Sequence, residues 1–485
     1  MDSPPPLITP QQDDTPTQER ASLDYPYNQT SLVVPELSTL LNRFDLSRIE
    51  GMTIWPSLNA DATSITVQLS ADCKDWTITL PVGKLHAVDL ISSGYYNFKN
   101  LSKLYLNRVS PPWKAVFFSR LRALSIWDCA DDTPKMDLQA FIDMVATWTS
   151  LQELELHNVL TAVLRDASES QSTTRRATLP KLELLTLVDL PEYTRCVLSC
   201  LKLPVCILAD IVGDLHHHDS CTNGRYYFWA LRDIVPPPPL ALAFLPFFPT
   251  CLNMDATGRE VGISGSTDDN KKVMLFVTTE QDFPERARAI FFSGAAHYLS
   301  RTFSPDGRAP TSILRFKGPL NMVSTFTWVE IFRAFPQLER LTVLDEGPDG
   351  PPSDALVKAL EATVLFERNP VRAVCSGLRY LSLRGVRYRK KELELLHKVL
   401  KRRTRSLGAE RLNVDIEFVL PPSGRKYLPP ESKICTLVRK KLASVALTVE
   451  TNEMCLIRVK RKWGPLSFIM ETALRLGLPS SGRPP

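Results

Sequence analysis

A leucine-patterned nonapeptide, L-x-x-L-x-L-x-x-N/C, recurs along the chain at irregular intervals. Its best copy is LRALSIWDC, in which Leu121, Leu124, Ile126 and Cys129 fill the four template positions. The L-x-L part alternates with period two, as a strand with one buried face must, and the outer positions turn the chain back under the sheet. Each copy is therefore predicted to be one strand of a parallel sheet.

Looser copies occur before and after this one. They are LSKLYLNRV from Leu101, LQELELHNV from Leu151, LELLTLVDL from Leu182, LERLTVLDE from Leu338 and LRYLSLRGV from Leu378, with degraded copies LHAVDLISS from Leu85 and RLNVDIEF from Arg411. The step from Leu101 to Leu121 is only 20 residues, whereas the step from Leu338 to Leu378 is 40. Because the shorter step leaves little room for a helix, we expect a loop such as SPPWKAVFFS to cover it.

Amphipathic helical segments lie between several copies. DLQAFIDMVATW has apolar residues at three and four spacing, and Asp137 is its predicted cap. TWVEIFRAF, SDALVKALEATVLF (with Ser353 as its cap) and KELELLHKVLKRR follow the same pattern. Strand, loop, helix and strand is the unit of a right-handed α/β solenoid. The predicted fold class is α/β, an irregular leucine-rich-repeat-like solenoid or horseshoe with a parallel sheet on the concave face and helices or loops outside.

The chain divides into three predicted parts. Residues 1–30 form a disordered Pro-rich N-terminus, residues 31–420 the solenoid, and residues 421–485 a basic C-terminal extension. At 485 residues, an elongated array is favoured over one compact core. The N-terminus lacks the basic start and apolar run of a signal peptide, so the cytoplasm or nucleus is the expected compartment.

Residues 203–320 have a weaker leucine pattern. Strands are predicted at 207–212, 273–279 and 312–318, with a helix between the last two. Divergent repeats are favoured over an inserted domain. The apolar run Pro236–Met254 is interrupted by prolines and too short to span a membrane, which predicts buried core and no membrane partner.

Four segments carry a resemblance to a known family. They are NLSKLYLNRVSPPWKAVFFSRLRALSIWDC, DLQAFIDMVATWTSLQELELHNV, ATLPKLELLTLVDLPEYTRCVLSCLKLP and AFPQLERLTVLDEGPDGPPSDALVKALE. Their rhythm resembles the leucine-rich-repeat region of the F-box proteins of mushroom-forming fungi, over roughly residues 31–420. The resemblance implies the substrate-recognition part of an SCF-type ubiquitin ligase. A decayed paralogue without a ligase role is the alternative reading.

The F-box itself, with its Leu-Pro-x-Glu-type opening, is not found in this sequence. Residues 33–55, VVPELSTLLNRFDLSRIEGMTIW, resemble the stretch that follows an F-box in that family. A Skp-type adaptor is therefore an expected partner only if an F-box exists upstream.

Signatures of catalysis are not found in the sequence. It has no H-E-x-x-H pair, G-x-S-x-G elbow or phosphate-binding glycine loop, so a non-enzyme without cofactor or metal is predicted. His216, His217, His218 and Asp219, with Cys206 and Cys221 nearby, combine zinc-ligand types, but consecutive side chains diverge and a solvated polar loop is favoured. Cys196 and Cys200 share one helix face, where core packing is favoured over redox chemistry.

Basic residues gather towards the C-terminus. From Arg384 to Arg405 there are ten Lys or Arg residues against two acids, and VRKKL and RVKRKW follow. Such runs are typical of nucleic-acid or chromatin association, which is the alternative function, and equally of a solvated helix face. Because aromatic stacking residues are few in this region, the solvated face is favoured.

Residues between the core leucines are predicted to project from the sheet towards a protein target. Interface energy concentrates on Trp, Tyr and Arg. The predicted partner-binding residues are Tyr105, Trp127, Glu155, His157, Arg340, Tyr380 and Arg384. The sequence thus predicts a protein-interaction scaffold that holds its target on the sheet.

Overall fold

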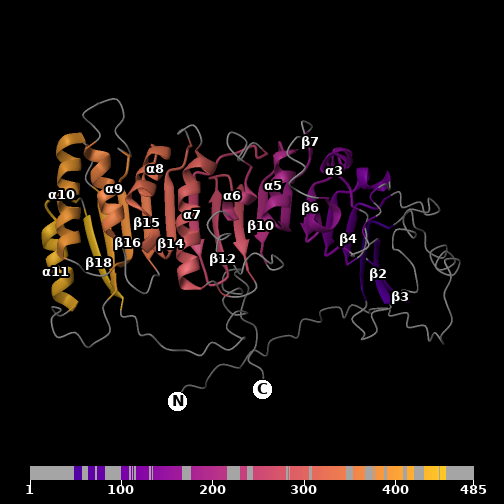
Figure 1. Cartoon of the computed structure of the whole chain (residues 1–485), viewed down its shortest axis with the longest axis horizontal. Coiled ribbons are helices and arrows are strands. Elements are labelled where there is room, and N and C mark those ends of the chain that lie inside the picture. The colour runs from indigo at the N-terminus through magenta and orange to yellow at the C-terminus, as the bar shows by residue number, and fades with distance from the viewer. Residues whose placement is uncertain are drawn as a thin grey trace, which may run out of the picture.

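The computed structural model has a mixed α/β fold built on one long sheet (Figure 1). The residues that it describes are 49–56, 64–71, 74–81, 100–108, 111, 113, 116–129, 133, 135–165, 176–215, 230–236, 244–279, 282, 284–304, 309–345, 353–365, 375, 377–386, 390–407, 412–419, 431–446 and 448–454. Sixteen strands form the sheet in the order β18-β17-β16-β15-β14-β11-β12-β13-β10-β8-β6-β5-β4-β1-β2-β3. Most neighbouring pairs run parallel.

The strands are short and regular. In chain order they are β1 (Gly51–Pro56), β2 (Ser64–Ala71), β3 (Lys74–Pro81), β4 (Lys103–Asn107), β5 (Ala123–Trp127), β6 (Glu153–His157), β8 (Leu184–Asp189), β10 (Leu208–Asp214), β11 (Cys251–Ala256), β12 (Glu260–Ser266), β13 (Lys272–Thr278), β14 (Ile313–Gly318), β15 (Arg340–Asp345), β16 (Tyr380–Val386), β17 (Asn413–Val419) and β18 (Thr448–Met454). Outside this sheet, β7 (Ala177–Thr178) pairs with β9 (Leu201–Lys202).

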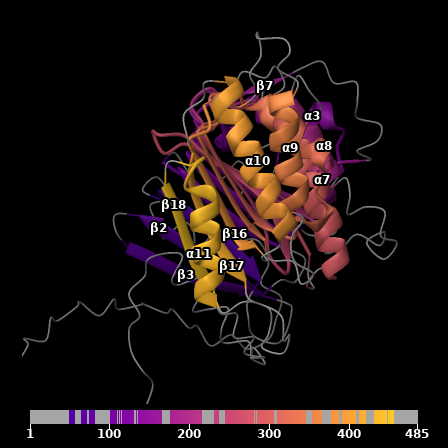
Figure 2. The same ribbon diagram turned by 90° about the vertical axis from the view of Figure 1, so that its left-hand side faces the viewer.

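Helices connect many of the strands. They are α3 (Leu138–Val145), α4 (Leu160–Val163), α5 (Pro191–Ser199), α6 (Ala230–Ile234), α7 (Glu285–Phe303), α8 (Thr325–Ala334), α9 (Ser353–Leu365), α10 (Lys390–Leu407) and α11 (Glu431–Leu442), with 3-10 turns η2 (Val116–Arg120) and η6 (Leu320–Met322). Helices α7, α8, α9 and α10 stand side by side on one side of the sheet (Figure 2). The outer layer therefore covers one sheet face.

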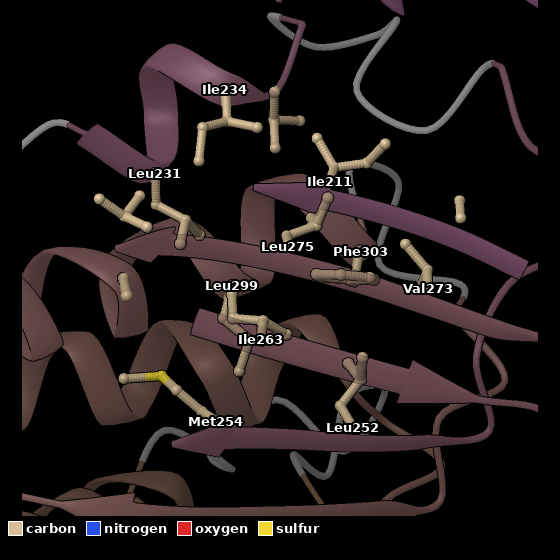
Figure 3. Packing of buried hydrophobic residues seen from close by; sticks show 14 of the residues in the cluster. Ile211, Leu231, Ile234, Leu252, Met254, Ile263, Val273, Leu275, Leu299 and Phe303 are labelled. Carbon is tan, nitrogen blue, oxygen red and sulfur yellow. The ribbon is translucent and has the colours of Figure 1, made fainter. Parts of the chain in front are cut away.

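A single core runs between the sheet and this layer. In β4, β5, β6, β8, β10, β11, β13, β14 and β15 every second residue is buried, as Leu104 and Leu106 are in β4. Figure 3 shows the middle of the core, where Leu275 of β13 lies among side chains of neighbouring strands, and where Leu299 and Phe303 come from α7. Burying alternate leucines at about 25 cal/mol per Å² of apolar surface is what holds each strand to the outer layer.

The six leucine-patterned nonapeptides are confirmed as strands of a largely parallel sheet. They form β4, β5, β6, β8, β15 and β16, and the degraded copy at Arg411 contains β17. The degraded copy at Leu85 lies outside the described residues. Asp137 caps α3 as predicted, because its Oδ1 accepts a hydrogen bond from the Ala140 amide at 2.7 Å. Helix α9 begins at Ser353 itself.

Connection length decides what covers each strand. The paired residues Lys103 of β4 and Ala123 of β5 are 20 positions apart in the chain, and the described part of that connection forms only η2. Arg340 of β15 and Tyr380 of β16 are 40 positions apart, which accommodates the 13 residues of α9. The expected loop over the short step is thus a 3-10 turn.

Two places depart from the predicted all-parallel sheet. Strand β2 runs antiparallel to both β1 and β3, and β12 runs antiparallel to both β11 and β13. Only residues 72 and 73 separate β2 from β3, and so short a connection can join only antiparallel neighbours. The apolar run Pro236–Met254, expected to be simply buried core, ends in an unpredicted strand, β11.

Residues 203–320 contribute to the same sheet as the leucine-patterned strands. The predicted strands appear as β10, β13 and β14, and the predicted helix as α7. The hairpin of β11 and β12 was not predicted. The sheet also continues past residue 420, because α11 and β18 add a helix and a parallel strand. The predicted boundary between the solenoid and a C-terminal extension at residue 420 is therefore wrong for α11 and β18.

The residue after each of β4, β5 and β6 adopts a left-handed conformation. These residues are Arg108, Asp128 and Asn158, with φ of 55°, 49° and 51°. Each amide donates to a carbonyl at the end of the next strand, for example Asn158 to Val188 at 2.8 Å. Asn and Asp tolerate this conformation better than most residues. The strand ends therefore stay hydrogen-bonded as the chain leaves the sheet.

Asp189, at the end of β8, ties two connections together. Its carboxylate accepts hydrogen bonds from the amides of Leu160 (2.6 Å), Thr161 (3.2 Å) and Leu190 (2.9 Å), at the starts of α4 and α5. The side chain is buried, and burial raises its pKa to about 6 against the opposing effect of these hydrogen bonds. Asp189 thus satisfies amides that the short helices leave without partners of their own.

Replacing this carboxylate should cost more than replacing an exposed helix cap. We expect Asp189→Ala to lower the free energy of unfolding by about 2–3 kcal/mol, because the buried Leu160 amide and the half-buried amides of Thr161 and Leu190 lose their acceptor. The control Asp137→Ala, at the exposed cap of α3, should lose about 1 kcal/mol. Urea unfolding at pH 7.5 measures both, and equal losses would contradict the role given to Asp189.

Candidate functional site

The sheet face away from the helices carries the residues between the core positions. In β4 the exposed or half-buried Lys103, Tyr105 and Asn107 alternate with buried leucines, and the other parallel strands repeat this pattern. We call this surface the open face. All seven predicted partner-binding residues occupy open-face positions. Their common face follows from the period-two alternation of a strand.

The structure does not bring these seven residues together at one place. Tyr105, Trp127, Glu155 and His157 lie on β4–β6, whereas Arg340, Tyr380 and Arg384 lie on β15 and β16. Six strands separate β6 from β15 in the sheet. At roughly 4.8 Å per strand, the two groups are about 34 Å apart. The open face therefore carries two separate groups of candidate residues.

The first group, which we call the aromatic–acid cluster, consists of Tyr105, Ser125, Trp127, Glu155 and His157. The Trp127 and His157 rings stack with centroids 4.0 Å apart, and the Tyr105 ring lies 6.2 Å from Trp127 at a tilt of 48°. Glu155 Oε2 accepts a hydrogen bond from Ser125 Oγ at 2.7 Å, and its Oε1 lies 2.9 Å from His157 Nε2. Trp127 Nε1 donates to Ser125 Oγ at 2.9 Å. These contacts hold the rings and the carboxylate in fixed positions.

Serine, histidine and glutamate occur together here, but their contacts are not those of a nucleophile and its base. A hydrolytic serine donates its proton to histidine, and the carboxylate stands behind the histidine. In this cluster Ser125 donates to Glu155, which lies between the other two. The arrangement orients side chains at a surface rather than activating the serine.

Asp210 of β10 lies beside this cluster in the same row of the sheet. The row runs Tyr105, Ser125, Glu155, Thr186 and Asp210 through paired residues of β4, β5, β6, β8 and β10. Burial, together with the negative charges of Glu260 and Glu155, raises the pKa of Asp210 to about 6. Among the described residues, Asp210 has no hydrogen-bond or ion-pair partner. Its charge is therefore poorly compensated.

The second group, the Arg384–Asp415 cluster, consists of Tyr380, Ser382, Arg384, Asp415 and Glu417. Asp415 Oδ2 accepts hydrogen bonds from Ser382 Oγ at 2.9 Å and from Tyr380 OH at 3.4 Å. Arg384 donates from Nε to Ser382 Oγ at 3.3 Å, and its guanidinium lies 3.6 Å from Asp415 and 3.9 Å from Glu417. Arg384 keeps 48% of its side chain exposed, so it remains accessible to a partner.

Apolar side chains occupy the middle of the open face. Val188, Val212 and Phe276 follow one another across paired residues of β8, β10 and β13, and Met274 lies two residues along β13 from Phe276. All four are half-buried. Phe276 lies over Gly262 of β12, where a Cβ would collide with the ring. A patch of half-buried apolar side chains thus lies between the two polar clusters.

The basic block does not form one continuous surface in the described structure. Arg384 is on the open face, whereas Arg403 is buried, with its guanidinium donating to the Cys375 carbonyl. On α10, Lys398 and Arg402 contact Glu361 of α9 at 3.3 Å and 2.6 Å. Residues 387–389 lie outside the described residues. Several of these cations therefore stabilise contacts within the chain.

The possible zinc ligands are mostly outside the described residues, because 216–229 are not described. Cys206 is buried, and its thiol donates to the Leu208 carbonyl at 3.3 Å. Cys196 and Cys200 are buried in the core of the helical layer. In the part of the chain that is described, no group of three metal-ligand side chains is placed to hold an ion.

Two open-face carboxylates were not among the site residues predicted from the sequence. Asp210 lies in the predicted strand ILADIV, and Asp415 in the degraded copy RLNVDIEF. In both segments a charged residue occupies a position between two apolar ones, which places it on the face opposite the core. The sequence therefore shows on which face such a carboxylate lies. It does not show which residues of neighbouring strands contact the carboxylate, because that depends on the register of the strands.

Comparisons with known proteins do not add a family to this geometry. No protein-family model matches the chain, and a search of curated proteins found no match. Over the residues described, none of the helices combines the length and apolar character needed to cross a membrane.

Stability should reveal the uncompensated charge of Asp210. The raised pKa means that the folded chain holds this proton more tightly than the unfolded chain, so the ionised carboxylate destabilises the fold above pH 6 and not below pH 4. We expect Asp210→Asn to increase the free energy of unfolding by about 1–2 kcal/mol at pH 7.5, after allowance for partial exposure, and by almost nothing at pH 4.

Urea unfolding at the two pH values measures this difference. Glu330→Gln, which removes an exposed carboxylate that contacts Arg333 on α8, is the control for losing one negative charge. A stabilisation by Asp210→Asn that is the same at pH 4 and pH 7.5 would show that ionisation of Asp210 is not its cause.

Proposed function

We propose that this chain is a non-catalytic protein-interaction scaffold that holds a protein target on the open face of its sheet. The observation that carries the proposal is the arrangement of that face, with two hydrogen-bonded clusters on either side of half-buried apolar side chains. Protein interfaces have the same organisation, with an apolar centre, a polar rim and anchors of Trp, Tyr and Arg.

The size of the open face suits a protein partner. From β4 to β17 it spans twelve strands in the sheet order, or about 53 Å across. Its three residue positions per strand give a height of roughly 14 Å, so the face covers about 700 Å². A specific interface of ordinary size buries about 800 Å² on each partner. One folded protein or one long extended segment would cover most of it.

The clusters also reduce the cost of binding. Trp127 and Glu155 are each held by more than one contact, and so is Asp415. A side chain already fixed in its bound position loses little entropy on association, whereas a free one costs about 0.5–1.5 kcal/mol to immobilise. This preorganisation favours a binding role for these side chains.

The resemblance to fungal F-box proteins adds a finer proposal. In that reading the open face recruits the substrate of a cullin ubiquitin ligase, and a Skp-type adaptor binds an F-box upstream of the leucine-patterned region. The finer proposal rests on the sequence resemblance alone. It requires the adaptor as well as the target.

Site-specific photocrosslinking tests the open face. A benzophenone amino acid at Thr186, between Glu155 and Asp210 in the sheet, should crosslink a protein target, whereas the same group at exposed Lys358 on α9 should not. Excess unlabelled chain should compete for the Thr186 product. Equal products from both positions, or a product at Lys358 alone, would contradict the proposal.

Affinity purification tests the ligase role separately. The tagged chain is compared with a version extended through any upstream coding sequence, and the co-purifying proteins are identified by mass spectrometry. We expect the adaptor and cullin only with the extended version. If neither version recovers them, the ligase role fails and the scaffold proposal stands on the crosslinking result.

A further inference from the structure

Charge is distributed unequally along the open face. On β6 and β10 the open-face acids are Glu153, Glu155, Asp210 and Asp214, whereas the open-face cations of β14, β15 and β16 are Arg315, Lys317, Arg340 and Arg384. On the acidic side, Lys103 of β4 is the one open-face cation among the described residues of β4–β10. A partner that fits the face must therefore present positive charge to the aromatic–acid cluster.

The rings of this cluster favour one kind of cation. Trp127 and Tyr105 are half-buried, with faces that meet at an angle, and Glu155 keeps 37% of its side chain exposed beside them. A planar guanidinium stacks on aromatic rings and donates paired hydrogen bonds to a carboxylate, whereas an ammonium is a strongly hydrated point charge. The combination of rings and carboxylate therefore discriminates Arg from Lys.

We propose that the aromatic–acid cluster binds an arginine-bearing basic segment of the protein target, with one guanidinium on Trp127 and Glu155 and a second positive charge beside Asp210. This inference rests on the proposed function and names the chemistry of the partner. When the guanidinium binds, Glu155 exchanges only the water on its exposed side for the cation. Its contacts with Ser125 and His157 remain. The bound cation compensates charges that the fold leaves close together.

The titration of Asp210 adds a second consequence. The charged groups that face Asp210 are the carboxylates of Glu155 on β6 and Glu260 on β12 and the ammonium of Lys272 on β13. Lys272 lies two residues along β13 from Met274, which pairs with Asp210. Thr186, which pairs with Asp210 from β8, is neutral. A bound cation lowers the pKa of Asp210 from its raised value, so binding releases a proton near pH 6. Affinity should therefore rise between pH 5 and pH 7.5.

The basic run RVKRKW of this chain follows β18 too closely to reach the aromatic–acid cluster. Strand β18 ends at Met454, and nine strand spacings separate β18 from β8, which is about 43 Å. The nine residues from Met454 to Trp463 extend at most about 32 Å. RVKRKW therefore does not reach the cluster, and the occupant that we infer from the charge of the face is a basic segment of a second protein.

Fluorescence polarisation with labelled peptides tests the inference on the full chain. The probes are fluorescein-labelled hexa-arginine and hexa-lysine. We expect hexa-arginine to bind at least threefold more tightly than hexa-lysine. Binding of hexa-arginine should be at least threefold tighter at pH 7.5 than at pH 5.

Matched variants locate the binding site. Glu155→Gln and Trp127→Leu should each weaken hexa-arginine binding at least fivefold, whereas Glu330→Gln, which removes the same charge from α8, should change it less than twofold. Unfolding midpoints confirm that each variant is folded. No binding of hexa-arginine, equal losses in Glu155→Gln and Glu330→Gln, or unchanged affinity in Trp127→Leu would overturn the inference.

The photocrosslinked target separates this inference from the proposed function. A target that crosslinks from Thr186 and is displaced by hexa-arginine supports both. If a target crosslinks from Thr186 but is not displaced, the scaffold proposal survives and the arginine inference fails. If no target crosslinks, the proposed function itself fails, whatever the peptides do.

Discussion

Burial of every second strand residue against the helical layer is the constraint on which this structure depends. Because side chains alternate between the two faces, a shift of one residue in any strand would send its leucines to the open face and its polar residues into the core. The paired leucines therefore fix the register from β4 to β17. That register then decides which open-face residues meet, such as Ser125 with Glu155 and Ser382 with Asp415.

The elements with strong local patterns could be predicted from the sequence. The leucine nonapeptides predicted the positions of six parallel strands, and amphipathic spacing predicted α3, α8, α9 and α10. Strands β1 to β3 and the β11–β12 hairpin were missed because apolar side chains in short runs do not distinguish a strand from other buried chain. A short connection such as residues 72–73 fixes an antiparallel pair only once both strands are known.

The candidate site was predicted in part. Placing Tyr105, Trp127 and Tyr380 on one face needs only the alternation of a strand, which the sequence displays. Predicting that they form two clusters requires the number of strands between them. That number could not be predicted, because residues 203–320 have a weak leucine pattern. Asp210 and Asp415 become notable only through neighbours on other strands, 30 or more residues away along the chain.

The central meander interrupts the simple succession of units. Along the sheet β10 is followed by β13, β12, β11 and then β14. After β10 the chain therefore skips the positions of β13 and β12 to form β11, and then fills them in turn with β12 and β13. Helix α7 leads the chain back across the sheet to β14. In an ordinary repeat array each unit docks on the one made before it, and the stack can grow one unit at a time. Here β10 has only β8 as a neighbour until β13 forms, and 57 residues separate the end of β10 from the start of β13. Because this long connection must close first, we expect the centre to be the slowest part of the sheet to assemble and to join the units on either side.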